Sequence, residues 1–316
     1  MSIAYEANFK AQSRRRTVAP PLIREHRIPT AGSKPYIAVE GRDHCLWFCE
    51  SGASKIGRLD PKSYSFTEFD LPTANATPIG IVEGADDAFW FAEKTGNKIG
   101  RITPEGKITE FPVPTPNAGP DAMMLGPDNN IWFSMTEVSR IGRLTPDGKI
   151  TEFNDGITPG SKPLSIVVRD GVMWFSEANG NHIGRMTVDG QITEFLIPTQ
   201  GSQPRAMCPH PDGSIWFVQT SANGLCRVDR DGGMVEYKVT TPNASLRSVC
   251  VGPDGDLWFT ENLANKIGRM APDGTMIGEY DIPTPNSGAR CITAMSDGRF
   301  FFTQWDAGLI GEVIVK

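Results

Sequence analysis

Leu257-Trp258-Phe259-Thr260-Glu261 is one of seven short aromatic motifs that recur along the chain. Their central aromatic residues follow one another at intervals of 43, 42, 42, 42, 42 and 43 residues, as Trp47, Trp90, Trp132, Trp174, Trp216, Trp258 and Phe301. A period near 42 residues with four short strands in each unit is typical of a β-propeller. The motif therefore predicts an all-β, seven-bladed β-propeller with four antiparallel strands per blade.

The repeat that opens at Pro78 contains all four predicted strands. We expect strands at residues 79–83, 88–93, 98–103 and 108–113. The Pro104-Glu105-Gly106 turn joins the last two, and it has the composition of a hairpin turn.

Ring closure is also predicted, because the last repeat supplies only three strands. Residues 23–29 match the fourth-strand pattern of residues 108–114, so we expect them to pair with residues 309–315 and to leave no exposed sheet edge. The sequence thus predicts one propeller domain at residues 22–316, preceded by an N-terminal extension at residues 1–21.

Two charged positions recur in nearly every repeat and are interpreted as scaffold. If the hairpin turns on Glu105-Gly106, Arg101 lies directly opposite Glu110, and opposite charges across a strand pair support the register. The same count places Glu312 opposite Glu25, with Arg24 or Arg27 as the compensating charge.

Composition limits the classes of partner and the cellular compartment that can be expected for this chain. The net charge is −6, which argues against a nucleic-acid or membrane partner. Arg14, Arg15 and Arg16 are followed by no apolar segment, so no targeting peptide is expected. The six cysteines form no CxxC pair, which favours reduced thiols in a cytoplasmic protein, expected to be a monomer.

Functional residues are sought where the repeat is broken, since the scaffold makes the same demands in every blade. After the first residue of the inner strand stand Tyr36, Ile79, Asp121, Leu164, Arg205, Arg247 and Arg290. At the end of the aromatic strand stand Glu50, Glu93, Met135, Glu177, Gln219, Glu261 and Gln304. Because the two strands are antiparallel neighbours, both positions are predicted to face one end of the channel.

Arg205, Arg247 and Arg290 fall in three consecutive blades, and a guanidinium cluster suits bidentate binding of carboxylate or phosphate. We expect them to bind a small anionic molecule, and the alternative is that each pairs with a neighbouring Glu. The other predicted substrate contacts are Gln219, Gln304, Asp121 and Trp305. The four histidines, His26, His44, His182 and His210, are predicted to lie on the surface.

The repeated phrase Trp258-Phe259-Thr260-Glu261-Asn262, followed by Asn265-Lys266-Ile267-Gly268-Arg269, resembles the streptogramin B lyase (virginiamycin B lyase) family. The resemblance covers residues 22–316. It implies a propeller that opens cyclic depsipeptides by Mg²⁺-assisted elimination, with a catalytic His after the inner-strand Pro of the last blade and a Glu ending the next strand. A second His is implied one blade earlier.

Three of the implied site residues differ in this sequence. Arg290 stands at the catalytic His position, Gln304 at the Glu position and Arg247 at the earlier His position. In addition, Ala289 replaces the preceding Pro, and Gly288 stands where an acidic residue is implied. A guanidinium is not a base at neutral pH, so the family's route is not expected in this protein.

Two functions of different classes remain open. The first is a lyase-like enzyme for a small carboxylated or lactone-type substrate, with Tyr36, Glu50 and Glu261 as acid–base candidates. Elimination, ring opening and proton-transfer isomerisation all fit these residues. The second is a non-catalytic anion-binding or protein-interaction propeller, and streptogramin lyase activity by an altered site is a third reading. No cofactor is required by the sequence; Mg²⁺ held by Glu93 and Glu177 is the metal alternative.

Overall fold

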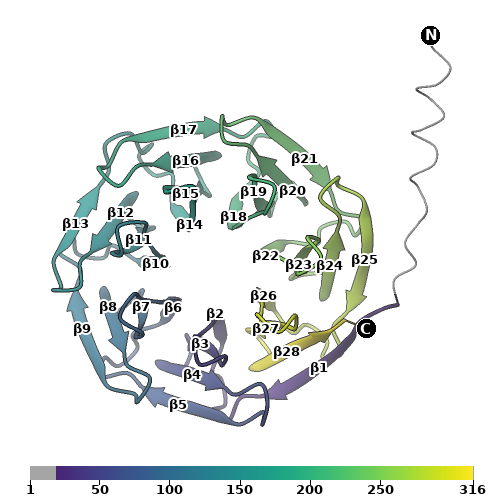
Figure 1. The fold of residues 1–316 in the computed structure, drawn as a ribbon, viewed down its shortest axis with the longest axis horizontal. Coiled ribbons are helices and arrows are strands. Elements are labelled where there is room, and N and C mark those ends of the chain that lie inside the picture. Colours follow the sequence, from purple (N-terminus) through teal and green to yellow (C-terminus); the bar gives the residue numbers. More distant parts are fainter. Residues whose placement is uncertain (1–18, 316) are drawn as a thin grey trace.

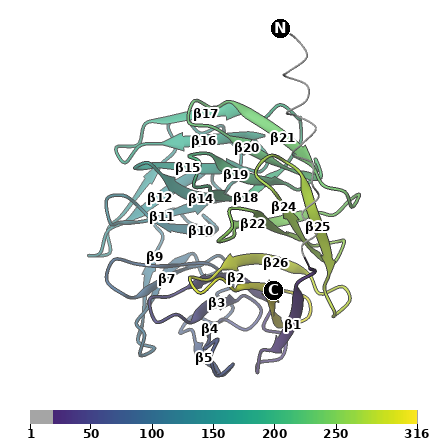
Figure 2. The ribbon, with the colours of Figure 1, turned by 45° about the vertical axis from the view of Figure 1, so that its right-hand side comes forward.

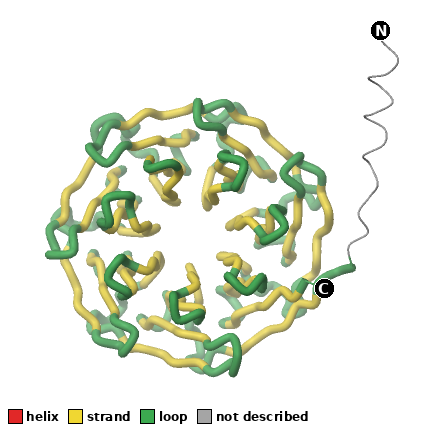
Figure 3. The backbone as a smooth tube through the Cα atoms, in the orientation of Figure 1, coloured by secondary structure: helices red, strands yellow, loops and turns green. Residues whose placement is uncertain are grey.

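The computed structural model describes residues 19–315, which form seven four-stranded antiparallel sheets arranged as a ring (Figure 1). These residues form strands and turns and no helix (Figure 3). The predicted seven-bladed propeller is therefore confirmed. Residues 1–18 of the predicted N-terminal extension lie outside the described residues.

Each blade runs from an inner strand at the ring axis to an outer strand at the rim (Figure 1). The inner strands are β2 (Pro35–Glu40), β6 (Pro78–Glu83), β10 (Pro120–Leu125), β14 (Pro163–Arg169), β18 (Pro204–Pro209), β22 (Leu246–Val251) and β26 (Ala289–Ala294). The second strands are β3 (Leu46–Glu50), β7 (Phe89–Glu93), β11 (Ile131–Met135), β15 (Val172–Glu177), β19 (Ile215–Gln219), β23 (Leu257–Glu261) and β27 (Phe300–Gln304). The third strands are β4 (Lys55–Leu59), β8 (Lys98–Ile102), β12 (Arg140–Leu144), β16 (His182–Met186), β20 (Gly224–Val228), β24 (Lys266–Met270) and β28 (Leu309–Ile314). The outer strands are β5 (Phe66–Asp70), β9 (Ile108–Pro112), β13 (Ile150–Phe153), β17 (Ile192–Leu196), β21 (Met234–Lys238), β25 (Met276–Asp281) and β1 (Leu22–Arg27).

The aromatic motif forms the second strand of each blade and is buried between blades. Successive side chains of a strand point to opposite faces, so Trp47 and Phe48 pack against different neighbours. Trp47 stacks on Phe89 of the next blade with ring centroids 4.3 Å apart. Phe48 packs with Phe301 of the last blade. Seven apolar clusters of this kind each join two adjacent blades.

The N-terminal strand β1 closes the ring by pairing with β28, as predicted (Figures 1 and 2). The predicted register is wrong by one residue, however, because Glu312 lies opposite Arg24 and Glu25 lies opposite Gly311. The Glu312 side chain is only 1% exposed and contacts Arg24 at 3.4 Å and Arg299 at 3.3 Å. Of the two compensating charges predicted, Arg24 therefore contacts Glu312, and Arg299 provides a second positive charge.

The predicted pairing of Arg101 with Glu110 is also wrong by one residue, because Arg101 lies opposite Thr109 and Glu110 opposite Gly100. The cause is the hairpin loop. The amide of Thr103 donates to the carbonyl of Lys107, so the loop holds three residues rather than two. Gly106 has the positive φ of +90° that such a loop places at its last position.

The recurring Glu and Arg therefore have separate structural roles. Glu110 accepts hydrogen bonds from the amide and hydroxyl of Thr73, in the segment that leads into the same blade, at 3.1 and 2.8 Å. The equivalent Glu–Thr contact occurs in all seven blades. Arg101 instead donates to Asp86 at 2.7 Å. Both residues are scaffold, as expected, but they do not pair with each other.

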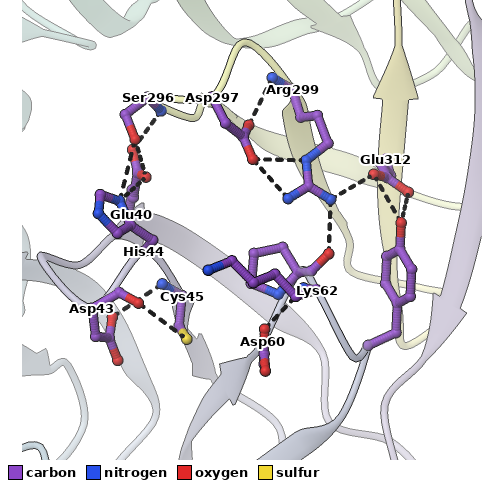
Figure 4. Close-up of polar contacts among 12 residues, drawn as sticks. Glu40, Asp43, His44, Cys45, Asp60, Lys62, Ser296, Asp297, Arg299 and Glu312 are labelled. Atoms are coloured by element: carbon purple, nitrogen blue, oxygen red, sulfur yellow. Dashed lines mark hydrogen bonds and ion pairs between the residues drawn. The ribbon is translucent and has the colours of Figure 1, made fainter.

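A polar seam joins the last blade to the first beside the closing strand (Figure 4). The Ser296 amide and hydroxyl both donate to the Glu40 carboxylate at 2.6 Å. Arg299 bridges Asp297, at 2.7 Å, and Glu312 (Figure 4). The Ser296–Glu40 hydrogen bonds cross from the last blade to the first, and Arg299 also crosses by donating to the carbonyl of Pro61 at 2.8 Å.

The histidine prediction is correct for His44, which is exposed, and wrong for His210, which is 6% exposed. The Nε2 of His210 lies 3.0 Å from the carbonyl oxygen of Gly255 in the neighbouring blade, so this ring helps to join two blades. All six cysteines are free. Within residues 19–315 no helix is long and apolar enough to cross a membrane.

Replacing Glu312 with alanine is expected to lower the free energy of unfolding by about 2 kcal/mol, because two guanidinium groups lose their shared buried acceptor at the closure. Denaturant unfolding followed by tryptophan fluorescence measures the change. Glu105→Ala, in an exposed turn, is the control and should stay within about 0.5 kcal/mol of wild type. Equal stability of the two variants would contradict a role for Glu312 in closure.

Candidate functional site

A cavity of about 420 Å³ lies on the ring axis and is lined by residues from all seven inner strands. Its charged residues and its one tyrosine stand at the second position of these strands: Tyr36, Asp121, Arg205, Arg247 and Arg290. The remaining wall is mostly apolar and includes Ile81, Met123, Ile166, Met207, Val249 and Ile292. The cavity is therefore mostly apolar, with its charged groups gathered near the start of the inner strands.

A backbone irregularity aims the polar residues at the axis. In β2, Pro35 pairs with Glu50 and Ala38 with Phe48, so two residues of β2 face one residue of β3. Every inner strand has the same register shift. A β-bulge re-aims the side chain it contains, and Tyr36 and the three arginines all occupy this bulge.

Hydroxyl groups of the second strands hold the bulges in place. The Thr260 hydroxyl accepts the amide of Ser248 at 3.1 Å and donates to the carbonyl of Arg290, one blade further on, at 2.7 Å. Thr303 donates in the same way to the carbonyl of Tyr36 at 2.7 Å. The scaffold of one blade thus fixes the site residue of the next.

The three guanidinium groups have no internal counter-ion. No carboxylate among the described residues lies within ion-pair distance of Arg205, Arg247 or Arg290, and the Nε of each is buried without a hydrogen-bond partner. Burial, together with the charges of Arg205 and Arg290, lowers the pKa of Arg247 to about 10. Arg247 therefore remains a cation at neutral pH, in a cavity with unbalanced positive charge.

Two aromatic rings flank Arg290. Its guanidinium carbon lies 5.0 Å from the centre of the Tyr36 ring and 4.4 Å from that of Trp305. Both distances are in the range of cation–π contacts. The structure thus brings together three of the predicted site residues, Tyr36, Arg290 and Trp305.

Asp121 lies in the same cavity and is paired with a residue that the sequence analysis missed. The Nζ of Lys94 is 2.9 Å from Asp121 Oδ2. Burial lowers and Asp121 raises the pKa of Lys94, and the net change is an increase, so this amine stays charged. Lys94 directly follows the second strand of its blade, where Trp305 stands in the last blade. Comparison of that repeat position across the blades would have found it.

The predicted residues at the end of the second strand do not reach the cavity. Glu50, Glu93, Glu177 and Glu261 are fully buried, and in the described chain neither oxygen of any of them has a hydrogen-bond partner. Glu50 instead crosses Gly57 of β4 toward Glu68 on the outer strand. The Gln219 side chain also points toward the outer strand, since its amide donates to Glu236 at 2.6 Å. Gln304 is likewise buried outside the cavity lining.

These glutamates form carboxyl pairs inside separate blades: Glu50 with Glu68, Glu93 with Glu110, Glu177 with Glu194 and Glu261 with Glu279. Burial first, and the neighbouring carboxylate second, raise the pKa of Glu50 and Glu261 to about 8. A protonated carboxyl can donate to its partner as the Gln219 amide does. The predicted acid–base roles of Glu50 and Glu261 beside Tyr36 are therefore not supported by their positions.

A divalent cation such as Mg²⁺ does not fit the cavity lining. Asp121 is the only carboxylate among the described lining residues, and Lys94 already occupies it. Glu93 and Glu177 lie in different blades, each directed at its own partner, so they do not form one Mg²⁺ site.

The comparisons with known proteins agree with this architecture. The model of the virginiamycin B lyase family matches residues 11–208 and 126–316. The chain belongs to this family. A solved structure of streptogramin B lyase superposes with a TM-score of 0.89 and 34% identity, over 94% of this chain and 98% of that one.

Two further members of the virginiamycin B lyase family are solved structures from Staphylococcus aureus. One is virginiamycin B lyase, at 34% identity and a TM-score of 0.89. The other is a catalytically inactive histidine-to-alanine variant with quinupristin, at 33% identity and a TM-score of 0.89. Each covers 94% of this chain and 100% of its own. No curated protein matches the chain.

Replacing Thr260 with valine is expected to lower the free energy of unfolding by about 1–3 kcal/mol, because the Ser248 amide and the Arg290 carbonyl lose their common partner. Valine fits sterically, since Val218 occupies the same position in another blade. Denaturant unfolding measures the change, and Thr260→Ser should retain wild-type stability. Equal stability of the valine and serine variants would show that the hydroxyl does not hold the bulge.

The carboxyl pairs predict a stability that falls as pH rises. Glu93 has a pKa of about 8 in the folded chain against about 4.5 when unfolded, so unfolding releases a proton between these values and stability is lost as pH rises through this window. A glutamine at this position does not ionise, so the Glu93→Gln variant releases no such proton on unfolding. The variant should be more stable than wild type at pH 8, by on the order of 2 kcal/mol, with the difference shrinking toward pH 5.

Melting temperatures at pH 5, 6, 7 and 8 measure this difference, and Glu105→Gln in an exposed turn is the matched control. A pH-independent difference between Glu93→Gln and wild type would mean that Glu93 is already ionised in the fold.

Proposed function

We propose that this protein is a lyase-like enzyme that binds a small carboxylated or lactone-type substrate in the axial cavity. The observation that carries the proposal is the set of three guanidinium groups without internal counter-ions in one largely apolar cavity. Partly buried charge without a counter-ion is unfavourable, and an anionic ligand offsets it. Guanidinium groups bind carboxylates in a bidentate manner.

The shape of the cavity limits the substrate. A volume of about 420 Å³ admits a small molecule, and the apolar wall below the arginines favours a hydrocarbon body with its negative group at one end. Arg205, Arg247 and Arg290 would hold that group. Trp305, stacked on Arg290, would cover it from the side.

The proposed chemistry begins with removal of a proton next to the substrate carbonyl. Tyr36, acting as the phenolate, is the proposed acceptor of this proton, because its ring lies 5.0 Å from the Arg290 guanidinium and therefore beside a carbonyl that Arg290 holds. The guanidinium groups stabilise the negative charge that develops on the carbonyl oxygen. In an elimination, the electron pair of the broken C–H bond then forms a C=C bond while the ester C–O bond breaks and a carboxylate leaves. Return of the proton to another carbon would give isomerisation.

A second function, anion binding without catalysis, is favoured by the scarcity of bases in the cavity. The only lining carboxylate, Asp121, is paired with Lys94, and the position at which the family resemblance implies a histidine base holds Arg290. A cavity with three guanidinium groups to bind an anion and a single tyrosine suits a sensor as well as an enzyme. Turnover distinguishes the two functions.

Small di- and tricarboxylates, lactones and a type B streptogramin should be screened by thermal shift and by product analysis. A ligand of the native state raises the melting temperature. The double variant Arg247→Ala, Arg290→Ala should lose the rise that a carboxylate causes, whereas Arg230→Ala, outside the cavity, should keep it. Tyr36→Phe should retain the rise and lose turnover by about 100-fold or more.

Each other outcome has a definite meaning. Binding without turnover in wild type supports the non-catalytic function. If no anion shifts the melting temperature of wild type, the cavity does not bind small anions and the proposal is wrong.

A further inference from the structure

The first residue of the third strand holds a cation against the outer-strand Glu in two blades. Lys98 Nζ lies 2.6 Å from Glu110, and Arg140 lies 2.5 Å from Glu152. In the fourth blade this position is His182, on β16, and its partner is Glu194 on β17. The imidazole does not take over the ion pair, because its Nδ1 is 3.9 Å from Glu194 Oε2.

A third side chain completes the group in this blade. Glu177, at the end of β15, lies opposite His182 in the strand register, and Glu194 lies opposite Gly184 one strand further out. Ligand atoms of Glu177, His182 and Glu194 all lie within 4.8 Å of one another. Among the described residues no other three His, Cys, Asp or Glu side chains gather in this way.

Two of the three side chains, Glu177 and His182, have buried polar atoms that no residue of the described chain satisfies with a hydrogen bond. Glu177 is 0% exposed, and neither of its oxygens has a hydrogen-bond partner among residues 19–315. The Nδ1 of His182 is likewise buried without a partner in that range. Unsatisfied buried polar groups are costly, and here they converge on one point. Glu194 is anchored separately by the hydroxyl of Thr158 at 2.7 Å.

Charge explains why a metal ion suits this blade. In the second blade, the Lys98 ammonium provides the positive charge beside Glu93 and Glu110. In the fourth blade no lysine or arginine stands at this position, so a divalent cation would balance two carboxylates and use the free imidazole nitrogen. One imidazole and two carboxylates are a ligand set that Zn²⁺ accepts, whereas Mg²⁺ prefers oxygen ligands alone.

We propose that Glu177, His182 and Glu194 form a Zn²⁺ site inside the fourth blade, separate from the axial cavity. The ion would join β15, β16 and β17, with a water in the fourth position of a tetrahedral site. The side chains of His182 and Glu194 are 22% and 18% exposed, so the ion can enter from solvent without opening the blade.

The full chain, treated with EDTA and dialysed, should bind one Zn²⁺ per molecule in isothermal titration, and its melting temperature should rise with Zn²⁺ and not with Mg²⁺. Two variants copy residues that other blades already use. His182→Lys, as in the second blade, should remove the binding. Glu177→Gln, as in the fifth, should weaken it by about tenfold or more.

A gain-of-site variant and spectroscopy complete the test. Lys98→His recreates the same three ligands in the second blade, so it should bind two Zn²⁺ ions per chain. X-ray absorption of the wild-type complex should show one imidazole nitrogen among oxygen ligands. The proposal is overturned if wild type binds no Zn²⁺, or if His182→Lys binds one ion as tightly as wild type.

Discussion

The apolar layer between neighbouring blades is the constraint on which the rest of the structure depends. Each blade buries its aromatic strand against two neighbours, as Trp47 does on Phe89, and no blade can cover both of its faces alone. The ring is complete only when β1 joins β28. For this reason the Trp-Phe pair of the aromatic strand recurs in six of the seven blades.

The bulge at the start of each inner strand converts this uniform scaffold into a site. It aims one side chain per blade at the axis, and a hydroxyl such as Thr260 fastens the backbone of the neighbouring site residue. A position one strand away, at the end of the aromatic strand, is directed into the blade instead. Two adjacent positions of the repeat therefore have opposite surroundings, a cavity for Arg290 and a buried carboxyl pair for Glu261.

The period of the aromatic motif was sufficient to predict the seven blades and the strand that closes them, since both depend on counting residues. The register was not predictable in this way, because a three-residue loop at Gly106 shifts Glu110 by one place. The direction of Glu50 was missed for a similar reason. Strand neighbours share an end of the channel, but pleating and the bulge decide which side chains enter it.

The two proposed sites follow from one electrostatic argument. In a propeller, one ion pair within the repeat can balance the charges at equivalent positions of several blades, as Lys98 and Glu110 do in the second blade. Arg247 in the cavity and His182 in the fourth blade each break that balance and leave buried polar atoms without partners. Such groups reduce stability unless something outside the chain satisfies them. Their signs then indicate different ligands, an anion at the axis and a cation inside the blade.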